Sequence, residues 1–125
     1  MNASFLVMAG GAIGALLRYQ LGRVSMLLLG PNYPWGTLFA NLIGGLAMGL
    51  LAGLLGRLSG SGEALRLFVG VGILGGFTTF SAFSLDTALM IERGTLFAAA
   101  VYVTVSVVGA VAALFAGLAL ARAVA

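Results

Sequence analysis

Residues 75–84 read GGFTTFSAFS, and they lie inside a chain that is otherwise almost wholly apolar. Two adjacent glycines and four hydroxyl side chains stand here beside three phenylalanines. A helix in lipid tolerates such a stretch only where protein or water satisfies its backbone and hydroxyl groups. The stretch therefore indicates a membrane protein and marks the place where this chain does more than span the bilayer.

Composition supports an all-α integral membrane protein. The chain has 125 residues, of which 62% are hydrophobic and 7% charged, whereas a soluble domain carries about 25% charged residues. Histidine and cysteine are absent, which excludes disulfides, the usual zinc and haem sites and the commonest proton shuttle. The six arginines stand singly near segment ends, so they indicate membrane-interface anchors in contact with lipid and no nucleic-acid partner.

Four segments are long enough to cross a bilayer core, which needs about 20 helical residues. The start of the chain lacks a basic region and a cleavage site, so we expect the first segment to be retained as a span. The turns between segments leave no room for a soluble part, which predicts one transmembrane domain over residues 1–125. The expected helices cover residues 3–29, 35–55, 65–91 and 95–120.

The third segment is predicted to break near mid-membrane. Each glycine of the pair Gly75 and Gly76 weakens a helix by about 1 kcal/mol relative to alanine, and the nearby hydroxyls can replace lost backbone partners. A break exposes carbonyl oxygens that can coordinate Na⁺, while the half-helix N-terminus can face an anion. Phe80 and Phe83 are three apart and share a helix face, where their positive ring edges can face an anion or simply pack.

Three polar side chains in the other spans extend this pattern. Asn41 offers two N–H donors, which suit either a small anion or a helix–helix hydrogen bond. Tyr102 and Ser106 are four apart in the fourth segment and share a face. Asp86 is interpreted as a helix-end group or a partner for an arginine.

The inventory argues against an enzyme. Residues 70–75 fit G-x-G-x-x-G, but that fingerprint requires a strand before it and lies here in the middle of an apolar span. Paired carboxylates and nucleophile–base pairs are absent from the sequence. Hydrogen-bond donors without embedded proton carriers favour passive permeation of a small hydrated anion, so the residues alone indicate a small ion channel or transporter.

Glycine and arginine spacing both predict an oligomer. Small residues recur four apart in every segment, a pattern that lets helices pack closely on more than one face. If Arg18 reaches its nearer membrane surface, three arginines lie on each side, and the usual charge bias on orientation vanishes. Two oppositely inserted copies would then form an antiparallel homodimer with dual topology.

Three motifs resemble the Fluc/CrcB fluoride channels over essentially the whole chain: GGAIGALLRY at 10–19, GTLFANLIGG at 36–45 and GGFTTFSAFS at 75–84. The resemblance implies a fluoride-selective channel in the bacterial inner membrane, built as an antiparallel dual-topology homodimer with two pores. It also implies passive export of toxic fluoride.

The resemblance further implies roles for individual residues. The carbonyls of Gly75 and Thr78 from two subunits would hold a central structural Na⁺ that is not transported. Arg18 would have a structural or vestibule role. Ala82 and Ala110 depart from the family pattern by lacking a hydroxyl, and Asp86 stands where Glu is usual. The fluoride pathway would be lined by Asn41, Phe80, Phe83, Ser81, Tyr102 and Ser106.

Two other classes remain as alternatives. A small multidrug-type dual-topology transporter would need an acidic residue in the first segment, which has none. A non-transporting membrane assembly subunit would leave the polar stretch at 75–84 without a role.

Overall fold

A computed structural model describes residues 2–58, 60 and 62–124, and nearly all of them are helical. The third segment is divided into four short elements, whereas the other three segments are continuous helices. The elements are α1 (Ala3–Leu29), α2 (Trp35–Leu55), α3 (Glu63–Leu65), η1 (Arg66–Leu74), α4 (Gly75–Phe77), α5 (Ser81–Glu92) and α6 (Leu96–Ala123).

Four of the helical stretches are long and apolar enough to cross a membrane, which confirms the predicted all-helical, four-span class. The third span runs over Glu63–Glu92, slightly longer at both ends than expected from the sequence. The fourth begins at Leu96 and extends to Ala123, three residues past the expected end at residue 120.

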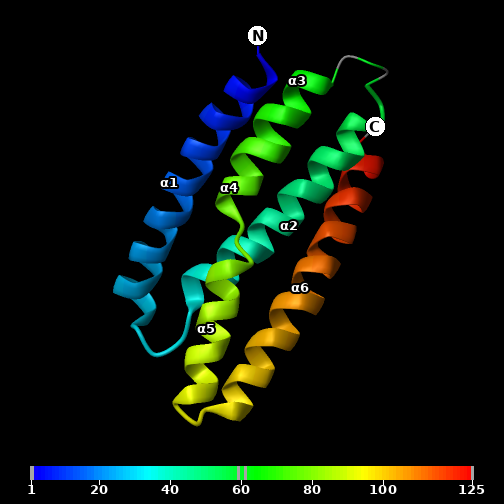
Figure 1. Cartoon of the computed structure of the whole chain (residues 1–125). Coiled ribbons are helices and arrows are strands. Elements are labelled where there is room, and N and C mark those ends of the chain that lie inside the picture. Colours follow the sequence, from blue (N-terminus) through cyan, green and yellow to red (C-terminus); the bar gives the residue numbers. More distant parts are fainter. Residues whose placement is uncertain (1, 59, 61, 125) are drawn as a thin grey trace.

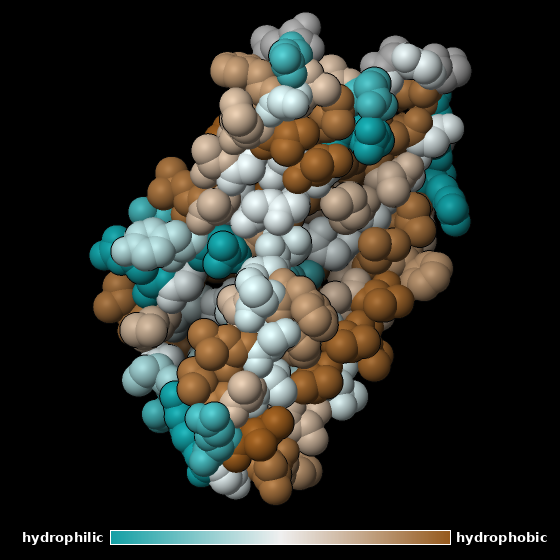
Figure 2. Space-filling view, viewed as in Figure 1, coloured by the Kyte–Doolittle hydropathy of each residue, from teal (hydrophilic) through white to brown (hydrophobic). Residues whose placement is uncertain are grey.

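The helices form two tightly packed pairs. Figure 1 shows α1 beside the upper half of the third span and α2 crossing behind it to lie along α6. The N-terminus, the loop after α2 and the C-terminus all lie at one end of the molecule (Figure 1). Figure 2 shows hydrophobic residues over much of the length of the visible face, with hydrophilic residues gathered mainly near the ends and along one side.

Glycine allows both helix pairs to approach closely. A Cβ placed on Gly14 of α1 would collide with the carbonyl oxygen of Ile73 and lie 2.8 Å from the backbone nitrogen of Phe77. A Cβ on Gly49 of α2 would likewise collide with the carbonyl oxygen of Leu114 in α6. The spacing of small residues in the sequence therefore corresponds to backbone-to-backbone contact within one chain.

The third span is interrupted at residues 78–80, and this segment is called the interruption below. Thr78 is extended, with φ −87° and ψ 159°. The expected weak point at Gly75 and Gly76 remains helical, because Gly76 packs against α1, where a Cβ would lie 2.6 Å from the carbonyl oxygen of Gly11. Within the predicted stretch, the break therefore includes Thr78 and the β-branched Thr79 but not Gly75.

A π-helix, η1, precedes the interruption. The Gly75 N–H at its end donates to the carbonyl oxygens of Gly70 and Gly72. A π-helix of nine residues is uncommon and is often found near a functional site. A π-helix has a wider turn than an α-helix. Together with the interruption, it makes the side chains after residue 80 face a different direction from those of a continuous α-helix.

We predict that Gly14→Ala destabilises the fold. The added methyl group overlaps backbone atoms of η1 and α4, and overpacking of this kind costs about 1–3 kcal/mol. Gly11→Ala is the matched control, because a Cβ there meets no atom of the described residues within 4 Å beyond its own stretch of α1. Thermal unfolding of the detergent-purified protein should show a lower midpoint for Gly14→Ala only; equal midpoints would contradict the close contact.

Candidate functional site

The interruption begins a new helix rather than leaving a loose loop. The Thr79 Oγ1 accepts a hydrogen bond from the Ala82 N–H at 3.1 Å, so its side chain caps the first turn of α5. Thr78 stays bonded to the preceding helix, since its N–H and its hydroxyl both donate to the Leu74 carbonyl oxygen, at 3.0 Å and 2.9 Å. The two threonines therefore terminate one helix and start the next.

Asn41 of α2 contacts the interruption directly. Its Oδ1 accepts a hydrogen bond from the Thr79 N–H at 2.8 Å, and its Nδ2 donates to the Thr79 carbonyl oxygen at 3.0 Å. The side-chain amide of Asn41 therefore pairs with both the backbone N–H and the backbone carbonyl oxygen of Thr79. One of the two Nδ2 N–H bonds remains for a further partner.

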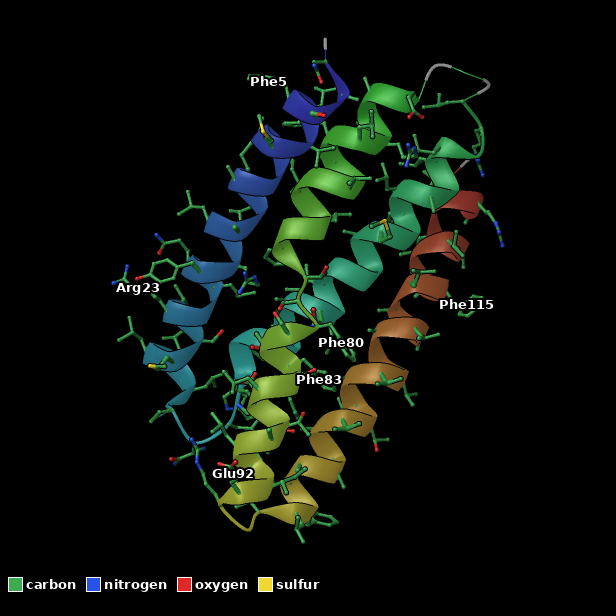
Figure 3. The ribbon with its side chains drawn as sticks, viewed as in Figure 1. Phe5, Arg23, Phe80, Phe83, Glu92 and Phe115 are labelled. Atoms are coloured by element: carbon green, nitrogen blue, oxygen red, sulfur yellow. The ribbon has the colours of Figure 1, made fainter. Side chains whose placement is uncertain are left out.

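Arg18 reaches the same region from α1. Its Nε donates to the Gly76 carbonyl oxygen at 3.3 Å, just before the interruption. The expectation that Arg18 extends to its nearer membrane surface is therefore wrong, because this carbonyl draws the guanidinium toward the middle of the span. Arg57, Arg66 and Arg122 belong to segments at the end that holds the termini, Arg93 follows α5 at the opposite end, and Arg23 lies beside α1 between the two ends (Figure 3).

The carbonyl oxygens of Gly75 and Thr78 accept no hydrogen bond among the described residues. Gly75 is exposed and Thr78 half-buried, and both line the groove described next. The described part of the chain contains no cluster of three or more His, Cys, Asp or Glu side chains suited to a metal. Backbone carbonyl oxygens without a hydrogen bond are groups of the kind that coordinate a hard cation at a broken membrane helix.

A groove of about 560 Å³ opens beside the interruption, between α2, α5 and α6. We call it the central groove. One end is polar and the other is lined by aliphatic side chains, including Met48, Val111 and Leu114. It gathers most of the residues that the sequence singled out, namely Asn41, Gly75, Thr78, Phe80, Phe83 and Ser106.

Two phenylalanines form one wall of the central groove. Figure 3 shows Phe80 and Phe83 next to each other just after the interruption, and their ring centroids are 5.5 Å apart. Phe83 is buried and packs on Tyr102 of α6 at 5.2 Å, whereas Phe80 is 75% exposed in the single chain. The two rings therefore differ in burial. Phe83 belongs to the hydrophobic core as well as to the groove wall, whereas Phe80 lines the groove and projects away from the core.

Two of the predicted hydroxyls belong to the fourth span, but only Ser106 lines the central groove and Tyr102 does not. Tyr102 is fully buried, and its hydroxyl donates to Asp86 Oδ2 at 3.1 Å. Asp86 was expected at a helix end or beside an arginine; it lies within α5 and its hydrogen-bond partner is this tyrosine. Ser106 lines the central groove, and its hydroxyl is buried without a hydrogen-bond partner among the described residues. Ser81 lies outside the groove lining and is exposed, with its Oγ 3.3 Å from Thr79 Oγ1.

A second cavity, of about 260 Å³, lies at the end of the molecule that holds the α1–α2 loop. Thr37, Asp86 and Arg93 line it, and burial raises the pKa of the nearby Tyr33 hydroxyl. Sequence reasoning missed Thr37, although it lies four residues before Asn41 on the same face of α2.

Fold and site together define a small multi-pass membrane protein with a polar groove at a broken span. The family model described as CrcB-like protein, Camphor Resistance (CrcB), matches residues 5–118. The chain belongs to the CrcB family, which confirms the resemblance drawn from the three motifs.

Curated relatives resemble the chain along its full length. It is 56% identical to a protein of Novosphingobium aromaticivorans over all of both chains. It is 58% identical to one of Phenylobacterium zucineum, over 98% of this chain and 97% of that one. Both relatives carry the name fluoride-specific ion channel FluC, which agrees with the expectation that this chain is not an enzyme.

We predict that Thr79→Val lowers the stability of the fold by about 1 kcal/mol, because valine keeps the shape but loses the oxygen that caps α5. Thr79→Ser retains that oxygen and should stay near the wild type. The single tryptophan, Trp35, provides a fluorescence signal for thermal unfolding in detergent. Equal losses in both variants would show that the cap contributes nothing.

Proposed function

We propose that this protein is a fluoride-selective channel through which fluoride leaves the cell by passive electrodiffusion, lowering cytoplasmic fluoride. The observation that carries the proposal is the central groove, which is lined by Phe80, Phe83 and Ser106; the buried Ser106 hydroxyl has no hydrogen-bond partner among the described residues. A hydroxyl donor and positive ring edges suit a small anion. The names of the full-length relatives support the choice of fluoride.

The pathway follows the groove from the interruption toward α6. Asn41 presents its remaining N–H, and Phe80 and Phe83 present ring edges, near the interruption. The Ser106 hydroxyl follows, and the Tyr102 hydroxyl leads on toward Asp86 and the second cavity. Ser81 extends the polar surface outside the groove; Ala82 and Ala110 contribute no hydroxyl.

Passive movement of fluoride is supported by the scarcity of side chains that could carry a proton. Histidine is absent from the sequence and α1 contains no acidic residue. A small multidrug-type transporter exchanges protons at an embedded carboxylate in the first span, so it is the weaker candidate. None of the described residues that line the central groove is a titratable proton carrier, and Asp86 lines the second cavity instead.

The working channel is proposed to be a homodimer of two antiparallel copies in the bacterial inner membrane. Phe80 projects from the single chain and the central groove is open on one side, so a second copy would complete the wall. Arginines stand on segments at both ends of the molecule, so the charge bias on orientation is weak, which favours insertion in both directions.

A structural Na⁺ at the dimer centre is proposed to be held by the carbonyl oxygens of Gly75 and Thr78 from both copies. These oxygens fit such a role, because they accept no hydrogen bond among the described residues. One chain offers too few of them to replace an ion's hydration shell, which is consistent with sharing between two copies. The bound ion would hold the two interruptions together and would not be transported.

We predict fluoride efflux from liposomes that contain the purified protein, well above protein-free liposomes. Phe80→Ile should lower the rate by about fivefold, because loss of a ring edge worth about 1 kcal/mol weakens the anion path. Phe97→Ile is the control, since Phe97 is 83% exposed at the start of α6, outside the groove. Absence of efflux from correctly folded wild-type protein would sink the channel proposal.

Exchange of Na⁺ for the bulkier cation N-methylglucamine is expected to destabilise the dimer. Carbonyl ligands placed for a small ion cannot enclose a large organic one. Size-exclusion chromatography and thermal unfolding in the two salts would measure the effect. Indifference of both to the cation would argue against the central site while leaving the anion path untouched.

A further inference from the structure

The structure assigns Asn41 a positioning role: it holds the interruption in its non-helical conformation through a two-point pairing with Thr79. Lining the fluoride path is a separate role for the same side chain. The pairing joins Oδ1 to the Thr79 N–H at 2.8 Å and Nδ2 to the Thr79 carbonyl oxygen at 3.0 Å. A side-chain amide thus does for one residue what a neighbouring strand does for a residue in a sheet.

Thr79 needs these partners because the interruption removes its helical ones. In a continuous helix its N–H would donate to the Gly75 carbonyl oxygen, four residues back. Thr78 is extended instead, and the Gly75 oxygen accepts no bond among the described residues. A buried backbone group left unpaired is costly in a membrane, so the broken form persists only if another group supplies both bonds.

Asn41 is well placed to fix the position of the interruption. Its helix, α2, contacts α6 backbone to backbone, since a Cβ on Gly45 would lie 2.7 Å from the Ala110 carbonyl oxygen. Arg18 bonds the Gly76 carbonyl oxygen from α1 on the other side. The interruption is therefore held between two helices, and Asn41 sets where Phe80 and the Thr78 carbonyl lie relative to α6.

An aspartate at position 41 provides a reversible test of this role. A protonated carboxyl group has the donor and acceptor pattern of the amide, so it can make both bonds to Thr79. The ionised carboxylate accepts from the Thr79 N–H but cannot donate to the Thr79 carbonyl oxygen. Asn41→Asp should therefore behave like the wild type when protonated and lose one bond when ionised.

Other charged and titratable groups act on the same carboxyl group. Arg18 in α1 favours its ionised form, whereas Asp86 in α5 disfavours it and burial does the same; Tyr102 in α6 bonds Asp86. The measurement must therefore scan from about pH 4 to about pH 9, which brackets the ordinary aspartate pKa and large shifts from it. Groups on the packed elements that lie farther along the spans are Tyr19, Arg23, Glu63, Arg66, Glu92 and Arg122.

The experiment compares thermal unfolding of wild type, Asn41→Asp and Asn41→Leu across this range, in fluoride-free buffer. The midpoint of Asn41→Asp should fall relative to wild type as the pH rises and should recover when the same sample is acidified. Asn41→Leu makes neither bond, so its midpoint should stay low at every pH. A pH-independent difference between Asn41→Asp and wild type, or no difference at all, would overturn the positioning role.

Fluoride efflux provides a second readout, which rests on the proposed function. Efflux through Asn41→Asp, corrected for protein-free liposomes, should fall roughly tenfold on ionisation, the factor set by one unpaired buried group, and should recover with the unfolding midpoint. Efflux loss with an unchanged midpoint would assign Asn41 to anion binding alone and overturn the inference. Absence of wild-type efflux would instead count against the proposed function, while the unfolding result would still judge the pairing.

Discussion

An interrupted helix inside a membrane depends on replacing the hydrogen bonds that the helix has lost. Residues 78–80 leave the helical path, and lipid offers their peptide groups no partner. Asn41 pairs with both groups of Thr79, the Thr79 hydroxyl caps α5, and Arg18 bonds the Gly76 carbonyl. The central groove lies beside this arrangement and is lined by the two phenylalanines and by Gly75 and Thr78, whose carbonyl oxygens accept no hydrogen bond among the described residues.

Close helix packing supports the interruption from both sides. Glycines allow α1 to contact η1 and α4, and allow α2 to contact α6, through backbone atoms. These two closely packed helix pairs hold the interruption in a fixed position. A fixed position matters for an ion site, because the site depends on where its coordinating groups lie. In the single chain, apolar side chains are exposed on several faces of the spans. Lipid and a second copy of the chain would cover these side chains.

Sequence reasoning succeeded where a pattern is local and failed where a distant contact decides. α1 and α2 have the bounds expected from their apolar runs. The glycines and hydroxyls of residues 75–84 correctly indicated a broken third span; within that stretch the break lies at residues 78–80, because α1 packs on Gly76 and the glycines stay helical. Spacing alone could not reveal that Arg18 turns inward to a carbonyl 58 residues away. Ser81, placed in the predicted pathway by resemblance, lies outside the groove lining.

Selective electrodiffusion of fluoride is the central claim, and current across a planar bilayer tests it most directly. With fluoride on one side and chloride on the other, the reconstituted protein should carry a current whose reversal potential follows the fluoride gradient and ignores chloride. Such a result requires a continuous anion path through the groove. A reversal potential that responds equally to chloride, or the absence of any current from folded protein, would contradict the account.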